Sequence, residues 1–438
     1  MKKLKIWAMN LSKKSKIFRE FARKTMYIIK RTKYVITGLN KKTDEKIVLF
    51  SCFNGKSYTC SPKAIYEYML SDEKYKDYQF IWFFKDVQKY EFLNKNKNTK
   101  VVKSYSKEFT KFMQTAKYWF FNYKIADYIK PKKTQVFTQC WHGTPLKRLG
   151  YDLVHFDNQL NTVKEMKKRY KVETEKFTYF ISPSKYASEV FKSAWNMKEF
   201  GKENCIVEKG YPRNDSLFHF TENDVSEIKK RILGEDIKNK KIILYAPTYR
   251  ANQHESGVGY VYKEEVDFEK MQKKLGDDFI ILFRPHYFVA SIFDFEKYKG
   301  FVYNASDVDD INDLYIISDI LITDYSSVFF DYANLKRPMI FYMYDLEYYR
   351  DKSNGFYFDV EDSLPGKIVK TDDDLIDEII RVSKEFNFDE KYEKFNAKFN
   401  YLDDGEASKR VVEYIIKWIR SLKYSSLRIY TKTNSKIL

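Results

Sequence analysis

From residue 47 onward, short apolar runs alternate with longer segments of mixed polarity. In the first half of the chain, these runs predict buried strands at Ile47–Phe53, Phe80–Lys85, Lys100–Lys103, Tyr118–Asn122, Gln135–Cys140 and Thr178–Ser182. Segments such as Pro62–Leu70 and Lys107–Thr115 predict helices between them. Because alternating strands and helices form parallel sheets with both faces covered, this half predicts an α/β domain that ends near Asp215.

A second alternating series follows a polar stretch at residues 221–240. It predicts strands at Lys241–Ala246, Phe279–Phe283, Gly300–Val302, Ile320–Thr323 and Pro338–Tyr342, with helices at 264–275, 308–318, 327–335 and 373–386. A last helix, about 406–422, is expected to cross back to the first domain. The fold class is therefore α/β, with two doubly wound, Rossmann-like domains whose strand ends face a shared cleft. We place the domains at residues 47–220 and 221–405, with a helix and basic tail at 406–438.

Residues 1–46 have a different pattern, with apolar residues at helical spacing among many lysines. Leu4, Trp7, Ala8 and Leu11 form one stripe, and Phe18, Phe21 and Ile29 continue it. Such a helix can lie in a lipid interface with its lysines against the headgroups. The alternative is a helix docked on the protein's own body with its lysines in water.

Charge is concentrated at the two ends of the chain. The net charge is +18, of which residues 1–42 contribute +13 and residues 407–438 contribute +7, which leaves −2 for the body between them. A nucleic-acid enzyme usually carries its basic face on the folded body, so nucleic acid is not an expected partner. Basic ends on a nearly neutral body favour an anionic membrane surface. No apolar run approaches the ~20 residues of a membrane-spanning helix, and no signal-peptide pattern is present, so we expect a peripheral protein on the cytoplasmic face.

Several common sites are excluded by spacing. The four cysteines, Cys52, Cys60, Cys140 and Cys205, form no CxxC pair and are expected to be free thiols. There is no GxGxxG and no GxxxxGK[ST], so no motif supports an NAD-type or P-loop site. No paired Asp stands at a strand end, and the acids at 307–313 fall at a helix start, where they complement the helix dipole. We therefore expect neither a metal nor a cofactor.

Two of the five histidines directly follow predicted strands. His142 lies in a Cys-Trp-His-Gly-Thr-Pro run and His286 in an Arg-Pro-His run. Strand ends open into the cleft, where a neutral imidazole can take a proton from a hydroxyl near pH 7. Gly143 allows close approach of the backbone to a ligand, and Thr144 can cap the next helix. A structural role remains the alternative for either histidine alone.

Groups suited to phosphate cluster in the second domain. Thr248 and Arg250 follow one strand, while Ser326 and Ser327 follow another and open a helix, whose free N–H groups attract anions. Asp331 lies just over one turn further and can face the same site. Arg213, in a Gly-Tyr-Pro-Arg-Asn-Asp loop, could hold a diphosphate bidentately. The alternatives are an N-cap for Ser326, a surface charge for Asp331 and a turn salt bridge for Arg213.

Taken in order, these motifs resemble those of one family. His142-Gly143-Thr144-Pro145, Gly210 to Asp215, Ala246 to Arg250, Arg284-Pro285-His286 and Thr323 to Ser327 are similar to the motifs of the CDP-glycerol glycerophosphotransferases of teichoic-acid synthesis, over roughly residues 47–420. The resemblance implies a GT-B-like fold. It also implies transfer of glycerol phosphate from CDP-glycerol to a hydroxyl of a polyprenyl-diphosphate-linked saccharide or a polyol-phosphate chain, with release of CMP.

The resemblance also assigns roles to residues. His142 is implied as the base on the acceptor hydroxyl, and His286 as a contact to the diphosphate and the leaving CMP. The substrate-binding residues it implies are Gly143, Thr144, Pro145, Leu146, Arg213, Pro247, Thr248, Arg250, Arg284, Pro285, Ser326, Ser327 and Asp331. CDP-ribitol as the donor, a capsule polymer as the product, and a GT-B glycosyltransferase using a nucleotide sugar remain alternatives, and the sequence does not set the oligomeric state.

Overall fold

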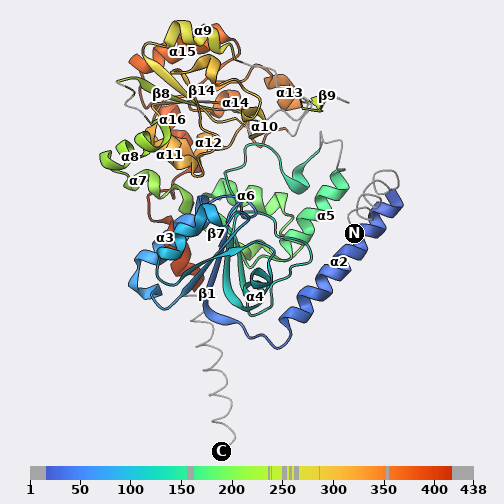
Figure 1. Ribbon diagram of the computed structural model, residues 1–438. Helices are drawn as coiled ribbons and strands as arrows, with labels where there is room; N and C mark the ends of the chain where they lie inside the picture. The colour runs from blue at the N-terminus through green and yellow to red at the C-terminus, as the bar shows by residue number, and fades with distance from the viewer. Residues whose placement is uncertain are drawn as a thin grey trace, which may run out of the picture.

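The computed structural model describes residues 16–154, 162–234, 237, 239–248, 254–255, 259–260, 266–285, 287–351 and 355–416. These residues form two α/β domains of similar design, one above the other in Figure 1. His286 and Arg250 lie outside the described residues, as do the apolar positions 4–11 and most of the basic tail.

In the described part of the first domain, seven parallel strands form one sheet in the order β3-β2-β1-β4-β5-β6-β7. The strands are β1 (Asp44–Ser51), β2 (Gln79–Phe84), β3 (Thr99–Lys103), β4 (Ala116–Phe121), β5 (Val136–Gln139), β6 (Tyr179–Ser182) and β7 (Ile206–Glu208). The longer helices that accompany them are α3 (Cys60–Ser71), α4 (Lys107–Thr115), α5 (Val163–Thr174) and α6 (Lys185–Ala194).

The second domain repeats this plan with six parallel strands among its described residues, in the order β12-β11-β8-β13-β14-β15. They are β8 (Lys241–Ala246), β11 (Phe279–Phe283), β12 (Val302–Asn304), β13 (Ile320–Thr323), β14 (Met339–Tyr342) and β15 (Lys367–Val369). Its helices include α8 (Glu222–Leu233), α9 (Phe268–Leu275), α11 (Ile311–Ile317), α12 (Val328–Tyr332), α15 (Asp372–Lys384) and α16 (Glu390–Phe399). A two-stranded pair, β9 (His254–Glu255) and β10 (Gly259–Tyr260), stands apart from the sheet.

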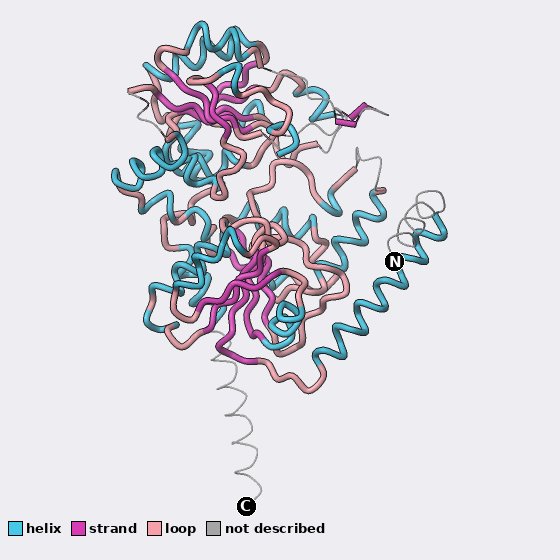
Figure 2. The backbone as a smooth tube through the Cα atoms, viewed as in Figure 1, coloured by secondary structure: helices cyan, strands magenta, loops and turns pink. Residues whose placement is uncertain are grey.

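Side chains on both faces of each sheet are buried, as the near-continuous apolar strands predicted. In β1, Val48 and Phe50 pack into one core cluster, whereas Ile47 and Leu49 pack into the cluster on the opposite face. Figure 2 shows the two strand bundles, each surrounded by helices and loops. The predicted class of two doubly wound sheets facing a cleft is confirmed.

The strand order places the site. In both sheets the chain winds outward from a central strand and then restarts on its other side, between β1 and β4 in the first sheet and between β8 and β13 in the second. Ligands of open α/β sheets bind outside the carboxyl ends of strands at such switch points.

Near its end, the chain returns to the first domain. The helix at residues 407–416 places Val411, Val412, Ile415 and Ile416 in the core cluster beneath β1, and they are essentially buried there. Asp215 caps its start, since its carboxylate accepts hydrogen bonds from the backbone N–H groups of residues 407 and 408 at 3.0 and 2.8 Å. The two domains are therefore joined covalently at residues 220–240 and again through this helix.

Polar contacts also cross between the domains beside the cleft. Asp310 pairs with Lys63 at 2.6 Å, and Asp309 pairs with Lys89 at 2.7 Å and accepts from the Tyr90 hydroxyl at 2.7 Å. The sequence predicts these acids to complement a helix dipole. Asp310 does cap α11, but its carboxylate also neutralises a lysine of the other domain.

Candidate active site

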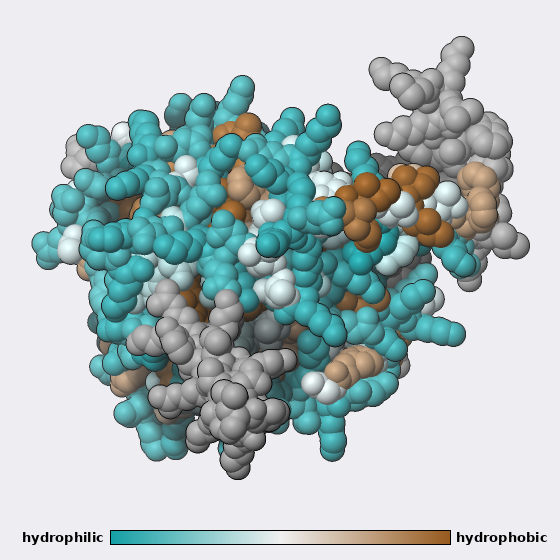
Figure 3. Space-filling view, turned by 90° about the horizontal axis from the view of Figure 1, so that it is seen from below, coloured by the Kyte–Doolittle hydropathy of each residue, from teal (hydrophilic) through white to brown (hydrophobic). Residues whose placement is uncertain are grey.

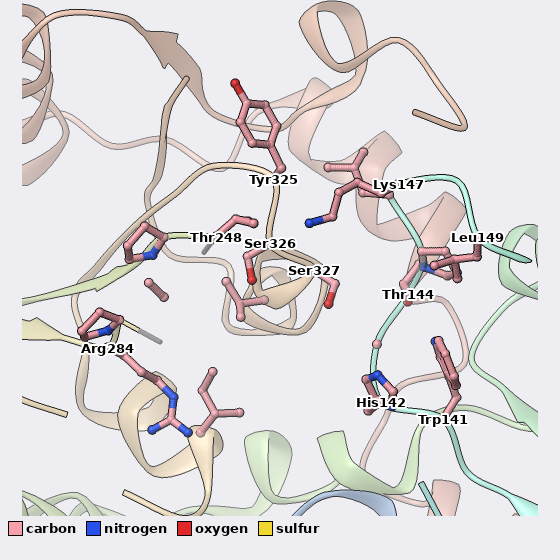
Figure 4. A pocket seen from close by; sticks show the side chains of 18 residues that line it. Trp141, His142, Thr144, Lys147, Leu149, Thr248, Arg284, Tyr325, Ser326 and Ser327 are labelled. Carbon is pink, nitrogen blue, oxygen red and sulfur yellow. The ribbon is translucent and has the colours of Figure 1, made fainter. Parts of the chain in front are cut away.

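A cavity of about 450 Å³ opens between the two sheets at the carboxyl ends of β5, β8, β11 and β13. Its lining from the first domain is the loop after β5, at residues 141–147 and 149. The second domain supplies the turns after its strands, with Ala246, Pro247, Thr248, Arg284, Pro285, Tyr325, Ser326, Ser327 and Val328, and also Ile311 from α11. Figure 4 shows these side chains converging from the two domains.

His142 is held in one orientation by its backbone neighbours. Its Nδ1 lies 2.9 Å from the carbonyl oxygen of Asn122, which can only accept, so Nδ1 carries the proton and donates. The ring packs between Trp141, at 4.2 Å between centroids, and Phe53, at 5.7 Å. The Nε2 atom of the neutral imidazole is then the proton acceptor, as a general base requires.

The pKa of His142 is lowered from 6.5 to about 4, because burial disfavours the imidazolium and the Arg213 guanidinium repels it; the hydrogen bond to Asn122 opposes the shift. A base works only when unprotonated, so activity should persist as pH falls below 6.5 and be lost only toward pH 4. We expect the acid limb of a kcat/KM profile over pH 4–8 well below 6.5. A limb centred at 6.5 would contradict this environment for His142.

The backbone next to His142 is held in place by buried hydrogen bonds. Trp141 has φ of +49°, a left-handed conformation unusual for a bulky residue. Its N–H donates to Oε1 of Gln139 at 3.0 Å, and the Gln139 amide donates to the buried Glu173 carboxylate at 3.0 Å. Burial raises the pKa of Glu173 to about 7. This buried polar chain fixes the turn that brings the imidazole into the cavity.

Arg213 and Asp331, which the resemblance implies as substrate-binding residues, do not line the cavity. Arg213 is 8% exposed and Asp331 is 1% exposed, and they form an ion pair with each other behind the cavity wall. The Arg213 NH1 atom also donates to the carbonyl oxygen of His142 at 2.5 Å. The Asp331 carboxylate accepts from Asn214 at 3.1 Å. The pair therefore links the His142 loop to the start of α12 across the domain boundary.

The second-domain wall presents cationic and hydroxyl groups. Arg284 donates to the carbonyl oxygens of Ala305 and Val308, each at 2.8 Å, which fixes its guanidinium beside the cavity. Ser327 is the N-cap residue of α12, yet its hydroxyl makes no capping hydrogen bond. Asp324 accepts from the backbone N–H of Thr248 at 2.8 Å and so ties the turns after β8 and β13 together. The wall suits a phosphate-bearing ligand.

Sequence reasoning did not assign Lys147, although it stands in the same run as the predicted Gly143–Leu146. Figure 4 shows its amine pointing into the cavity toward Ser326. The backbone beside it bridges to the second domain, where residue 147 pairs with Phe356 and the N–H of Arg148 donates to Gly355 at 3.1 Å. Sequence reasoning also assigned no role to the apolar and aromatic lining, because these side chains carry no acid, base or charge that would single them out even inside a motif. They are Trp141, Leu149, Ala246, Ile311, Tyr325 and Val328.

Gly143 lies where the two domains approach each other closely. A Cβ atom built on it would lie 2.5 Å from the Ser327 hydroxyl and 3.2 Å from the Ser327 Cβ.

Overpacking of this kind costs ~1–3 kcal/mol, so Gly143→Ala should raise the donor KM by about tenfold. In a Ser327→Gly background, where the clashing side chain is absent, Gly143→Ala should raise the donor KM by a smaller factor than it does in the wild type. Equal donor KM values for Gly143→Ala and the wild type would show that the walls are not in contact.

Within the described residues, no group of three or more His, Cys, Asp or Glu side chains is placed to hold a metal ion. The cysteines there are free: Cys52, Cys60 and Cys140 are buried, and Cys205 is half-buried. No helix in the part of the chain that the structure describes is both long and apolar enough to cross a membrane.

Two facing doubly wound domains, with an oriented histidine from one and phosphate-compatible groups from the other, define a GT-B-like group-transfer fold. The sequence profile of the CDP-glycerol:poly(glycerophosphate) glycerophosphotransferase family matches residues 30–417. The chain belongs to this family, as its motifs implied.

Two curated relatives and one solved structure support the assignment. The chain is 39% identical over 404 residues to the teichoic acid poly(glycerol phosphate) polymerase of Bacillus spizizenii, covering 92% of this chain and 100% of that protein. It is 40% identical over 375 residues to the polymerase of the same name from Bacillus subtilis, covering 85% of this chain but only 49% of that longer protein. The structure of the wall teichoic acid polymerase TagF superposes with a TM-score of 0.79 at 35% identity, over 92% of this chain and 98% of that one.

Proposed function

We propose that this chain transfers glycerol phosphate from CDP-glycerol to a terminal hydroxyl of a polyol-phosphate chain or of a lipid-linked saccharide, and releases CMP. The observation that best supports this proposal is the cavity, in which an oriented, neutral His142 lies opposite Arg284, Ser326 and Ser327. Family membership and the poly(glycerol phosphate) polymerases among the relatives support glycerol phosphate as the group transferred. The donor is the only small molecule, besides the acceptor, that this proposal requires.

In the proposed reaction, the acceptor hydroxyl gives its proton to Nε2 of His142 while its oxygen attacks the β-phosphorus of the donor. The bond between the β-phosphorus and the bridging oxygen breaks, and that oxygen leaves with CMP. Arg284, Lys147 and the two serine hydroxyls surround the diphosphate, where cations and hydrogen-bond donors stabilise the developing charge. His286 and Arg250, which follow β11 and β8 in the sequence, are proposed to contact the donor, and His286 to steady the leaving CMP.

A donor screen tests this proposal. Purified protein is incubated with CDP-glycerol, CDP-ribitol or a UDP-sugar, each with a synthetic lipid-linked disaccharide primed with glycerol phosphate, and the released nucleotide is identified. CMP from CDP-glycerol is the expected product. Preferential use of CDP-ribitol would reassign the alditol, and release of UDP from the sugar donor would favour the glycosyltransferase alternative.

We further propose that α2 (Lys16–Gly38) holds the enzyme on an anionic membrane surface where lipid-linked acceptors reside. Its second half is docked, since the Gln114 amide donates to the Tyr34 carbonyl oxygen at 2.9 Å, while its first half projects from the body (Figure 1). Apolar side chains gather along this projecting arm in Figure 3, and Phe21 is 67% exposed. Exposed apolar residues among Arg and Lys suit an interfacial helix.

Vesicle sedimentation tests the membrane proposal. Phe21→Ser combined with Ile28→Ser should lower binding to phosphatidylglycerol vesicles, while leaving turnover of a water-soluble acceptor unchanged. The matched control is Phe388→Ser, an exposed aromatic of the second domain. Equal sedimentation of the α2 variant and the wild type would contradict a role for this helix.

A further inference from the structure

The first domain has a switch point of its own that the cavity does not use. The cavity lies at the second domain's switch point, between β8 and β13, whereas the first domain contributes the loop after β5. The first domain's own switch point, between β1 and β4, lies beside that loop, because β4 pairs with β5. In open α/β sheets, ligands bind outside the carboxyl ends of the strands at such a switch point.

Phe53 follows β1 and Asn122 follows β4, so both lie at this switch point, and Asn122 is hydrogen-bonded to His142. The Phe53 N–H donates to Oδ1 of Asn122 at 2.8 Å, and the carbonyl oxygen of Asn122 accepts from Nδ1 of His142. The Phe53 ring meets the imidazole edge to face. Phe53 therefore lies directly beside the imidazole of His142.

Phe53 belongs to a row of exposed residues that leads away from His142. The Tyr105 hydroxyl donates to Oδ1 of Asn54 at 2.6 Å, so Tyr105, Asn54 and Phe53 are contiguous; we name them the aromatic row. Phe53 is 37% exposed and Tyr105 is 50% exposed. All three have left-handed φ values, of 46°, 60° and 64° for Phe53, Asn54 and Tyr105, a strained conformation that clusters at ligand sites.

Positive charge accompanies the row. Lys85 follows β2, and its N–H donates to the carbonyl oxygen of Gly55 at 2.7 Å; Lys103 ends β3, and both lysines are exposed. Asp86 is the acid beside them, and its carboxylate accepts from the N–H of Gln88 at 3.2 Å. The carboxyl ends of the strands from β3 to β5 span four strand spacings, or about 19 Å. That length is enough for several units of an extended polyol-phosphate chain.

We propose that the aromatic row is the subsite for the acceptor chain, taking the polyol-phosphate units behind the terminal hydroxyl. The faces of Phe53 and Tyr105 cover the C–H groups of the polyol, Lys85 and Lys103 pair with its phosphates, and the terminal hydroxyl lies at Nε2 of His142. The identity of the acceptor rests on the proposed function; the location of the subsite rests on the contacts above.

Binding of a synthetic oligo(glycerol phosphate) to the full chain without donor tests the subsite by calorimetry. Tyr105→Ala removes a ring that does not touch His142 and should weaken oligomer binding by about tenfold, with the Kd for CDP-glycerol unchanged. Phe53→Leu should weaken it similarly, and Tyr105→Phe should lose less because the ring remains. Phe92→Ala, at an exposed aromatic outside the row, is the matched control and should match the wild type.

In steady-state assays, Tyr105→Ala should raise the acceptor KM by a similar factor with kcat preserved. Oligomer binding should also weaken as salt is added, because the contacts to phosphate are ionic. No saturable binding of the oligomer to the wild type, or equal Kd values for the wild type, Tyr105→Ala and Phe53→Leu, would overturn the proposal. Failure of the wild type to release CMP from CDP-glycerol would instead contradict the proposed function, and the binding assay does not depend on it.

Discussion

Replacing His142 by alanine is expected to lower kcat by about 10³-fold, because general-base catalysis by a positioned side chain contributes ~10²–10⁴-fold. The Kd of CDP-glycerol should change little, since the imidazole is assigned to the acceptor hydroxyl rather than to the donor. Release of CMP under saturating donor and acceptor measures kcat, and calorimetry measures the donor Kd.

His219→Gln is the matched control for this experiment. The Nε2 atom of His219 lies 3.0 Å from the carbonyl oxygen of Gly405, and His219 does not line the cavity. Glutamine can keep a hydrogen bond to that oxygen, so kcat should equal that of the wild type. A His142→Ala variant that retained more than a tenth of the wild-type kcat would remove the imidazole from the proton transfer.

The second large effect is expected at Asp331, because its loss leaves the Arg213 guanidinium charged and unpaired in the interior. Breaking a buried pair by removing one partner costs ~3–5 kcal/mol, so Asp331→Ala should lower the free energy of unfolding by that amount in urea titrations. Activity should fall too, since Arg213 also holds the carbonyl oxygen of His142.

The double variant Arg213→Met/Asp331→Leu separates stability from positioning. Apolar replacement of a whole buried pair is often neutral, so most of the lost stability should return. kcat should stay low, because no group then holds the carbonyl oxygen of His142. Full activity in the double variant would mean that Arg213 only neutralises Asp331 and does not position the base.

The strand runs in the sequence predicted the sheets well, and they placed His142 at a strand end in the cleft, because burial on both faces leaves a clear apolar pattern. Strands of three residues, such as β7 and β15, were missed since their runs are too short to stand out. A salt bridge was an alternative for Arg213, but its pairing with Asp331 could not be foreseen. Residues 118 positions apart neutralise each other only once the domains meet, and the sequence gives no register between the domains.

The same limit applies to the acids at the start of α11. Their local setting explained Asp309 and Asp310 as helix-dipole complements, and nothing local pointed to Lys63 and Lys89 of the other domain. The aromatic row could not be predicted either, because in the sequence Phe53 and Tyr105 are ordinary aromatic residues at or just after the ends of strands. Their exposure and left-handed φ values appear only in three dimensions.

The bond that breaks in the donor is the most direct test of the central claim. CDP-glycerol labelled at the β-phosphorus is incubated with the enzyme and an oligo(glycerol phosphate) acceptor, and the label is followed in the products. If His142 activates the acceptor for attack at that phosphorus, the label moves to the lengthened acceptor, the nucleotide product is unlabelled CMP, and His142→Ala shows almost no transfer. Label retained in the nucleotide, as CDP, would contradict the claim.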